Sequence, residues 1–276
     1  MRVVQKIDRE TWHDFIYNHP EGNVFQSPEM FDIYTNTTNF EPVLVAVVSR
    51  DGDILGIILA SIQREYTGPI GELTTRSIIW GGPLVKNNDA EVMTMLLHEY
   101  DDIVGKKVIL SQFRNLWDYS ACKCVFSKVG YRYSEHLNFV VDLSVGEERL
   151  FKNLSSSKRR QIRRSMEKEG VEIVMTTDES DIEELYGILS DYYSTSVKKP
   201  LPPLDYFLVL VRLLAERGMV RVFLVKYGKR IIGGIICPIS ENAFKKTIYE
   251  LYICGSRSHD RLYPSVLSTW APIEWG

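Results

Sequence analysis

The densest group of positive side chains in the sequence lies in the stretch N-L-S-S-S-K-R-R-Q-I-R-R-S-M-E-K-E-G, residues 153–170. Glu167 is the only acid between positions 158 and 168, and the cations there are Lys158, Arg159, Arg160, Arg163, Arg164 and Lys168. Guanidinium and ammonium groups at this density suit phosphate binding. The serines at 155–157 offer an N-cap and Gly170 offers a stop, so the stretch predicts a helix near 157–168, with Ile162 and Met166 able to pack inward.

The charges of this helix allow two interpretations. Lys158, Arg159 and Arg160 would lie in the first turn, where the helix dipole disfavours cations by roughly 0.3–1 kcal/mol each. A bound anion would offset that cost, with Lys158, Arg159 and Arg163 holding phosphates of a nucleotide-linked substrate or of tRNA. The alternative is a solvated surface helix in which Arg163 pairs with Glu167 one turn later.

Other residues could contribute to a binding site. Trp80, Gly81 and Gly82 end a predicted strand, where the glycines form either a bulge or a point at which the backbone approaches a ligand. Tyr192 precedes a proline-rich loop, and such a tyrosine is either half-buried core or the lining of a cleft.

The last predicted strand and helix carry three further candidates. Tyr249 and Tyr252 flank the strand and face the same two alternatives. His259, in S-R-S-H-D-R, is the best-placed histidine for acid–base chemistry, with an ordinary surface histidine as the alternative. We see no Ser-His-Asp or metal-ligand constellation and assign no catalytic residue.

Composition limits the class of protein. The 276 residues carry a net charge of -3, so anion recognition should be local and DNA is not an expected partner. The four cysteines show no ligand or disulfide spacing, which favours a reducing cytoplasm, and no cofactor or metal is predicted. The N-terminus has no secretory apolar region and no apolar run is long enough to cross a bilayer. The oligomeric state stays open.

Two segments of the sequence resemble each other. Residues 43–62 and 220–239 each consist of an apolar strand, a polar turn with glycine and a second apolar strand, which is typical of a β-hairpin. Ile54-Leu55-Gly56 aligns with Ile231-Ile232-Gly233, at an offset of 177 residues.

The flanks of the hairpins repeat as well. Helices are predicted at 10–18, from Ser27-Pro28, at 181–192 and at 204–217, followed after each hairpin by a strand (78–85 and 247–254) and a helix (90–104 and 265–275). The first copy continues with a strand at 107–113, a helix at 119–129 and a strand at 139–143, which the second copy lacks. We therefore expect an α/β (α+β) protein with two tandem units, 1–145 and 146–276, and mixed, mostly antiparallel sheets.

This element order resembles the GNAT acyltransferase fold, and the tandem arrangement resembles the bacterial Fem family, which adds amino acids from aminoacyl-tRNA to peptidoglycan precursors. The resemblance rests on V-F-Q-S-P-E-M (24–30), W-G-G-P-L-V (80–85), L-S-S-S-K-R-R-Q-I-R-R-S (154–165), K-R-I-I-G-G (229–234) and Y-P-S-V-L-S-T-W-A-P-I-E-W (263–275). Family members continue past this last helix with a further strand, so the second GNAT-like unit is expected to be incomplete.

The resemblance implies a cytoplasmic transferase that forms an amide on an amine of a cell-wall precursor, with aminoacyl-tRNA as a donor. Acyl-CoA-dependent GNAT proteins place a Gln/Arg-x-x-Gly-x-Gly/Ala turn before the helix that follows the fourth strand, and neither 84–92 nor 254–266 has that spacing. Acetyl-CoA is therefore expected to bind weakly. Two alternatives remain: an acyl-CoA-dependent N-acyltransferase acting on an amino sugar or polysaccharide precursor, and a non-catalytic binding module.

Overall fold

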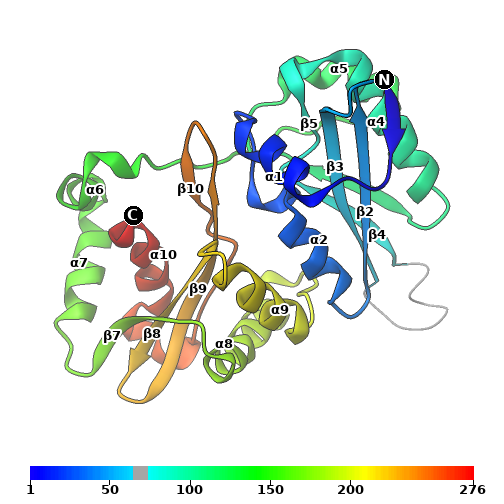
Figure 1. The fold of residues 1–276 in the computed structure, drawn as a ribbon. Coiled ribbons are helices and arrows are strands. Elements are labelled where there is room, and N and C mark those ends of the chain that lie inside the picture. The colour runs from blue at the N-terminus through cyan, green and yellow to red at the C-terminus, as the bar shows by residue number, and fades with distance from the viewer. Residues whose placement is uncertain (65–73) are drawn as a thin grey trace. The chain divides into compact units, whose positions relative to one another are not determined.

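The computed structural model describes residues 1–64 and 74–276 (Figure 1). The chain divides into two compact units, the first made of Met1–Phe139 with Ser240–Lys246 and the second of Val140–Ile239 with Thr247–Gly276. The first unit thus includes a short segment from the second half of the sequence, which the hairpin pattern does not predict.

The first unit has one sheet with strand order β1-β2-β3-β4-β6, and β5 also pairs with β3. Helix α4 packs on this sheet through the main apolar core, whose fully buried side chains include Ile58, Leu96 and Tyr100. The strands are β1 (Arg2–Val4), β2 (Phe40–Val48), β3 (Ile54–Gln63), β4 (Arg76–Trp80), β5 (Leu84–Val85) and β6 (Leu110–Arg114). The helices are α1 (Arg9–Asn18), η1 (Val24–Gln26), α2 (Pro28–Thr35), η2 (Lys86–Asn88), α4 (Ala90–Val104), η3 (Ser120–Cys122) and α5 (Lys123–Lys128). Ser27 caps α2 and Pro28 begins it, as predicted.

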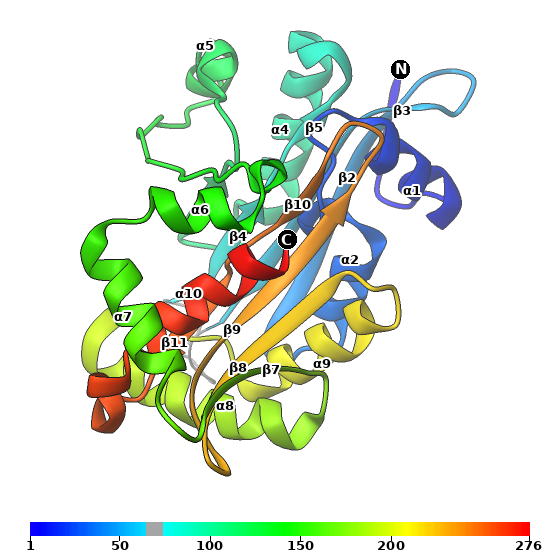
Figure 2. The ribbon, with the colours of Figure 1, turned by 90° about the vertical axis from the view of Figure 1, so that its left-hand side faces the viewer.

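The second unit has a sheet with strand order β10-β9-β8-β7, and β11 also pairs with β9. Figure 2 shows α10 on one face of this sheet and α8 and α9 on the other. The strands are β7 (Val171–Thr176), β8 (Val220–Tyr227), β9 (Arg230–Glu241), β10 (Lys246–Ile248) and β11 (Tyr252–Gly255). The helices are η4 (Leu143–Val145), α6 (Glu147–Asn153), α7 (Ser156–Met166), α8 (Glu179–Tyr192), the π-helical turn η5 (Tyr193–Val197), α9 (Leu204–Ala215), η6 (Arg257–Leu262) and α10 (Pro264–Trp275).

The two hairpins share an irregularity at the same place, which confirms that they are equivalent. In the first hairpin Val47 pairs with Gly56 and Val48 pairs with Ile54, which leaves Leu55 as the extra residue of a bulge. In the second hairpin the equivalent pairs are Val225 with Gly233 and Lys226 with Ile231, which leave Ile232 as the extra residue. A bulge redirects a strand, so both copies bend their second strand at the same point.

The strand that follows each hairpin is interrupted, where the sequence predicts one continuous strand. The predicted strand 78–85 is divided into β4 and β5, and the predicted strand 247–254 is divided into β10 and β11. The pieces rejoin the sheet in equivalent registers, because Gly56 pairs with Val85 and Gly233 pairs with Gly255. Apolar patterning identifies the strands but not the break within each.

The predicted strand at 139–143 is wrong. Residues 139–142 have no regular structure, and Leu143 begins η4. The side chains of Phe139 and Val140 are 92% and 89% exposed. The F-V-V pattern has strand propensity, but a strand forms only where a neighbouring strand accepts its hydrogen bonds, and no described strand does so here.

The equivalence of the repeats predicts that alanine at Gly56 and at Gly233 destabilises the protein by about 1–3 kcal/mol, because the added methyl group would overpack both positions. A Cβ at Gly56 would lie 2.9 Å from side-chain atoms of Leu96 and Val92, and one at Gly233 would lie 2.9 Å from the Cys254 carbonyl oxygen. Chemical denaturation measures both changes. Gly187→Ala is the control: this helical glycine has open space around it, so alanine there should stabilise by about 0.5–1 kcal/mol. Unchanged stability of Gly56→Ala and Gly233→Ala would contradict the packing described.

Candidate active site

Helix α7 carries the cationic stretch, and one of its sides borders an open hollow. Ser155 caps the helix as predicted, its Oγ accepting a hydrogen bond from the Lys158 backbone N–H over 3.3 Å. The hollow has a volume of about 380 Å³ and is lined by Ser156, Arg159, Arg160, Arg163, Arg164 and Glu167. Lys158, which the sequence places in the anion site, is not among the lining residues, whereas Arg160 and Arg164 are.

The inner face of α7 differs from the predicted one at one position. Ile162 is buried as expected, but Met166 is 43% exposed, so its predicted inward packing is wrong. Ser165 takes that place: it is fully buried and its Oγ donates to the Leu262 carbonyl over 2.7 Å.

Arg159 and Arg163 have contacts within the second unit. The Arg159 guanidinium donates to the carbonyl oxygens of Lys152, over 2.7 Å, and Leu154, and so satisfies carbonyls at the C-terminal end of α6. The Arg163 guanidinium lies 5.1 Å from the centroid of the Phe151 ring. Arg159 therefore has a structural role, and its predicted part in anion binding stays a prediction alongside it.

No carboxylate within the described part of the chain forms an ion pair with Arg160, Arg163 or Arg164. The i,i+4 pair of Arg163 with Glu167, which the surface-helix interpretation predicts, is also not formed. The exposed guanidinium groups beside the hollow thus keep their charge uncompensated, which favours an anion as their partner.

The break between β10 and β11 is a second candidate feature of this unit. The backbone N–H of Tyr249 donates to the Pro238 carbonyl over 2.9 Å, and that of Leu251 donates to the Ile236 carbonyl over 3.2 Å. Because successive peptides of a strand point to opposite sides, the peptide N–H of Glu250 between them points away from β9.

Glu250, which lies in this break, has a carboxyl group with a strongly raised pKa. Part of its side chain is exposed, yet the protein atoms packed around the carboxyl remove enough water to raise its pKa to about 7. Burial raises the pKa of the neighbouring Cys237 thiol, and the charge of the Glu250 carboxylate raises it further. A carboxyl group that titrates near neutral pH suits proton transfer. Sequence analysis missed Glu250, although an acid within the apolar run T-I-Y-E-L-Y-I-C is a usable signal.

The predicted tyrosines lie in and beside an aromatic cluster of the second unit. Tyr252 packs edge to face on Phe207, with ring centroids 4.9 Å apart, and lies 6.3 Å from Tyr193 and from Tyr206. Tyr192 contacts Tyr193 at 6.5 Å. Packing between strand β11 and helix α9 accounts for the position of Tyr252, and a substrate role for Tyr192, Tyr249 and Tyr252 stays a prediction.

His259 lies in η6, where its Nδ1 is 2.9 Å from the Ser258 hydroxyl and its ring is 6.2 Å from that of Tyr227. No contact joins it to Glu250 in the part of the chain that the structure describes. A role in acid–base chemistry therefore stays a prediction.

The glycines after Trp80 are in close contact with side chains of their own unit. The Asn23 amide donates to the Gly81 carbonyl and the Gln26 amide donates to the Trp80 carbonyl, each over 2.7 Å. A Cβ at Gly81 or Gly82 would lie within 2.8 Å of these amides. Close internal packing thus explains the glycines without a ligand, and substrate binding by Trp80, Gly81 and Gly82 stays a prediction.

Searches of the described residues give two further facts. They contain no group of His, Cys, Asp and Glu side chains that could hold a metal ion, and none of their helices is long and apolar enough to cross a membrane. The cysteines are unpaired, and Cys124 alone among them is exposed.

Comparison with known proteins bears on the fold. Residues 152–275 match the family model described as the acetyltransferase (GNAT) domain. The fold is similar to the crystal structure of FemX, with a TM-score of 0.70 and 13% identity over 100% of this chain and 85% of that one. L-PGS from Bacillus licheniformis is similar with a TM-score of 0.51 and 16% identity, over 100% of this chain and 74% of that one.

A third similar structure is a GCN5-related glucosamine N-acetyltransferase region of a fungal multi-domain β-N-acetylglucosaminidase. Its TM-score is 0.54 and its identity is 11%, over 99% of this chain and 33% of that one. A search of curated proteins found no match. The predicted Fem-like fold with tandem GNAT-like units is confirmed.

The contacts of Arg159 predict that Arg159→Gln lowers the free energy of unfolding by about 1–2 kcal/mol, the lower part of the range for hydrogen bonds of charged groups, because these bonds are partly solvated. Arg160→Gln, which removes the same charge from the next residue but no internal contact, should change stability by less than about 0.5 kcal/mol. Urea denaturation of both variants measures the difference. Equal stability of the two would show that Arg159 does not hold α6.

Proposed function

We propose, because a GNAT domain lies within a FemX-like fold, that this protein is an acyltransferase that forms an amide on a substrate amine. The observation that carries the proposal is the interrupted edge strand β10–β11, which presents a carboxyl group with a pKa near neutrality next to a peptide N–H that points away from the sheet.

Glu250 acts as the proton acceptor in this proposal. The amine nitrogen attacks the activated acyl carbonyl, the C–N bond forms, the bond to the donor oxygen or sulfur breaks, and the proton leaves the nitrogen for the Glu250 carboxylate. The peptide N–H of Glu250 donates to the acyl oxygen as negative charge develops on it. Positioning of the two substrates supplies the rest of the rate, and no covalent intermediate on the protein is needed.

The arginine hollow on α7 supplies the anion-binding part of the proposal. Arg160, Arg163 and Arg164 hold phosphate groups, either of a nucleotide-linked cell-wall precursor or of an aminoacyl-tRNA donor, in the cytoplasm. Support for a peptidoglycan precursor comes from the FemX-like fold alone, at 13% identity.

An acyl-CoA-dependent transfer onto an amino sugar is the second candidate. It is favoured by the description of the matching family as an acetyltransferase and by the similarity to a glucosamine N-acetyltransferase region. Against it stands the start of α10, where Pro264 occupies the first helical position and removes one of the N–H groups that would bind a pyrophosphate.

Calorimetric titration with tRNA, with a uridine-diphosphate-linked precursor and with acetyl-CoA identifies the anion that binds. Arg160→Gln/Arg164→Gln should weaken binding of the phosphate ligand at least about tenfold, because each charge-assisted contact contributes about 1.5–3 kcal/mol. Lys158→Gln/Lys168→Gln removes the same charge outside the hollow and should have a much smaller effect. Equal losses of affinity in both double variants would show that the ligand responds to net positive charge and not to the hollow. Tight acetyl-CoA binding would favour the second candidate.

The pH dependence of turnover tests the base. In the wild type the rate should rise with pH up to a plateau above about 7, since only the ionised Glu250 accepts a proton. Glu250→Gln should lower the rate by about 10²–10⁴-fold and abolish that rise. The fold should persist, because neutral glutamine resembles the protonated carboxyl that the raised pKa favours. A variant with full activity and the wild-type profile would exclude Glu250 as the base, and a wild type inactive with every donor would favour a non-catalytic binding module.

A further inference from the structure

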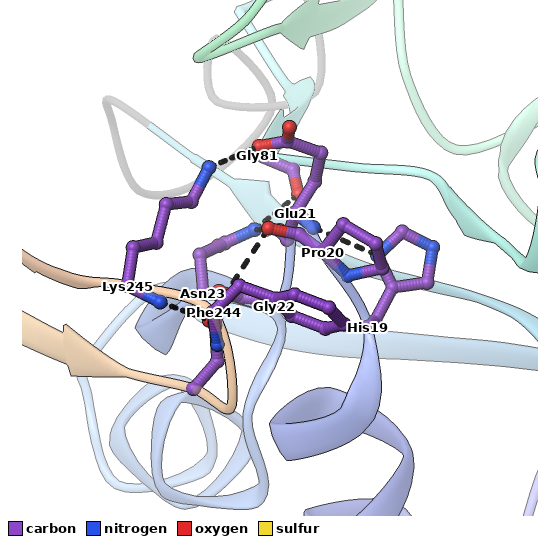
Figure 3. Close-up of polar contacts among 9 residues, drawn as sticks. His19, Pro20, Glu21, Gly22, Asn23, Gly81, Phe244 and Lys245 are labelled. Atoms are coloured by element: carbon purple, nitrogen blue, oxygen red, sulfur yellow. Dashed lines mark hydrogen bonds and ion pairs between the residues drawn. The ribbon is translucent and has the colours of Figure 1, made fainter.

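The tip of the second hairpin, Ser240–Lys246, is part of the first unit, and we call this segment the clasp. The chain leaves the second unit after Ile239 and returns to it at Thr247. Figure 3 shows the clasp against the loop that follows α1.

The clasp is held by hydrogen bonds from several of its residues. The Ala243 N–H donates to the Tyr17 carbonyl over 2.9 Å, and the Ser240 hydroxyl accepts from the Val24 N–H over 2.6 Å. The Lys245 ammonium pairs with the Glu21 carboxylate at 2.6 Å. Since this ion pair is partly exposed it contributes little, and the buried polar contacts hold the segment.

Asn242 is the central residue of the clasp and is 7% exposed. Its Nδ2 donates to the Gly22 carbonyl over 2.9 Å and to the Pro20 carbonyl over 3.4 Å. Its Oδ1 accepts from the N–H groups of Phe244, over 2.8 Å, and Lys245, over 2.9 Å. One end of the amide thus shapes the turn of the hairpin, and the other end binds the turn to the Pro20 and Gly22 carbonyls.

The loop that receives the clasp is itself fixed (Figure 3). Asn23, 1% exposed, donates to the carbonyls of Glu21 and Gly81. The His19 ring accepts from the Glu21 N–H through Nδ1, which leaves the proton on Nε2 to bond the Val85 carbonyl at 3.2 Å. Burial lowers the pKa of His19 and keeps this ring neutral. The loop is therefore a rigid support rather than a loose surface turn.

The clasp leads directly into the break that carries Glu250. Lys246 ends the clasp and begins β10, and Glu250 follows four positions later. Strand β10 is only Lys246–Ile248, and it pairs with β9. A strand of 3 residues has few hydrogen bonds of its own to hold it. The bonds that the clasp makes just before β10 therefore influence the orientation of the peptides that follow β10.

We propose that Asn242 is a positioning residue: by binding the clasp to the Pro20–Gly22 backbone, it fixes β10 and thereby the orientation of the Tyr249–Leu251 break. The catalytic meaning of this positioning rests on the proposed function, but the positioning itself does not.

Asn242→Asp tests the role of the donor end of the amide separately from that of the acceptor end. Aspartate keeps the oxygen that accepts from Phe244 and Lys245, so the hairpin turn persists, but it loses the donor and turns a carboxylate oxygen toward the carbonyls of Pro20 and Gly22. Phe244→Ala is the matched control, because Phe244 lies in the same turn, is 63% exposed and contacts Asn242 only through its backbone N–H.

Amide hydrogen exchange, measured by NMR without substrate, tests the proposal. In Asn242→Asp the Tyr249 and Leu251 amides, which bond to Pro238 and Ile236, should exchange at least about tenfold faster, whereas amides of the β7–β8 ladder should stay within about threefold of wild type. Phe244→Ala should leave both sets unchanged.

Wild-type exchange at Tyr249 and Leu251 in Asn242→Asp would overturn the proposal, and so would a uniform increase over the whole sheet, which would make Asn242 a general stabiliser. If Asn242→Asp does not fold, Ser240→Ala, which removes the single bond to Val24, is measured in the same way and should give the same local pattern at a smaller size. Because no turnover is measured, this result is independent of the Glu250→Gln experiment, and either can fail alone.

Discussion

One-sided pairing of the edge strand β10–β11 is the constraint on which the candidate site depends. In the first unit the equivalent strand β4 lies between two neighbours, antiparallel β3 and parallel β6. In the described part of the second unit, β10 and β11 bond to β9 alone. The peptide N–H of Glu250 therefore points away from β9, and the protein atoms around the Glu250 carboxyl raise its pKa to about 7. The equivalent strand position is thus paired on both sides in one copy and on one side in the described part of the other.

Helix α7 has a packed inner face and an exposed face of arginines within a few residues. Ile162 and Ser165 fix its inner side, and Arg159 reaches back to complete the end of α6. Of the remaining arginines beside the hollow, only Arg160 lies near the first turn, where the dipole disfavours a cation, whereas Arg163 and Arg164 lie in the last turn, where it favours one. None of the three has a counter-ion within the described chain. A phosphate bound in the hollow, as proposed above, would compensate these unpaired charges.

The sequence predicts the hairpins and their equivalence because two apolar strands around a polar turn with glycine, and the shared Ile-x-Gly, recur at one offset, whereas the bulge in each hairpin is seen only in the structure. It does not predict the strand breaks. In the second copy the break depends on which β9 carbonyls accept hydrogen bonds from the N–H groups of Tyr249 and Leu251. The clasp is missed for the same reason: Asn242 in a polar turn looks like an ordinary loop residue, and only its bonds to Pro20 and Gly22, more than 200 positions away, reveal it. Glu250 interrupts an apolar run, which is a signal, but the run does not show how closely protein atoms surround the carboxyl. Residues 139–143 mislead because propensity alone supplies no partner strand.

Direct titration of the Glu250 carboxyl is the measurement that tests the central claim. The protein is labelled with ¹³C at the glutamate side-chain carboxyl, the Glu250 resonance is assigned by its loss in Glu250→Gln, and its chemical shift is followed by NMR from pH 3 to pH 9. A midpoint about 7 would show that the broken strand holds a carboxyl poised for proton transfer. A midpoint near the ordinary glutamate value of 4.5 would contradict the assignment of this residue as the base.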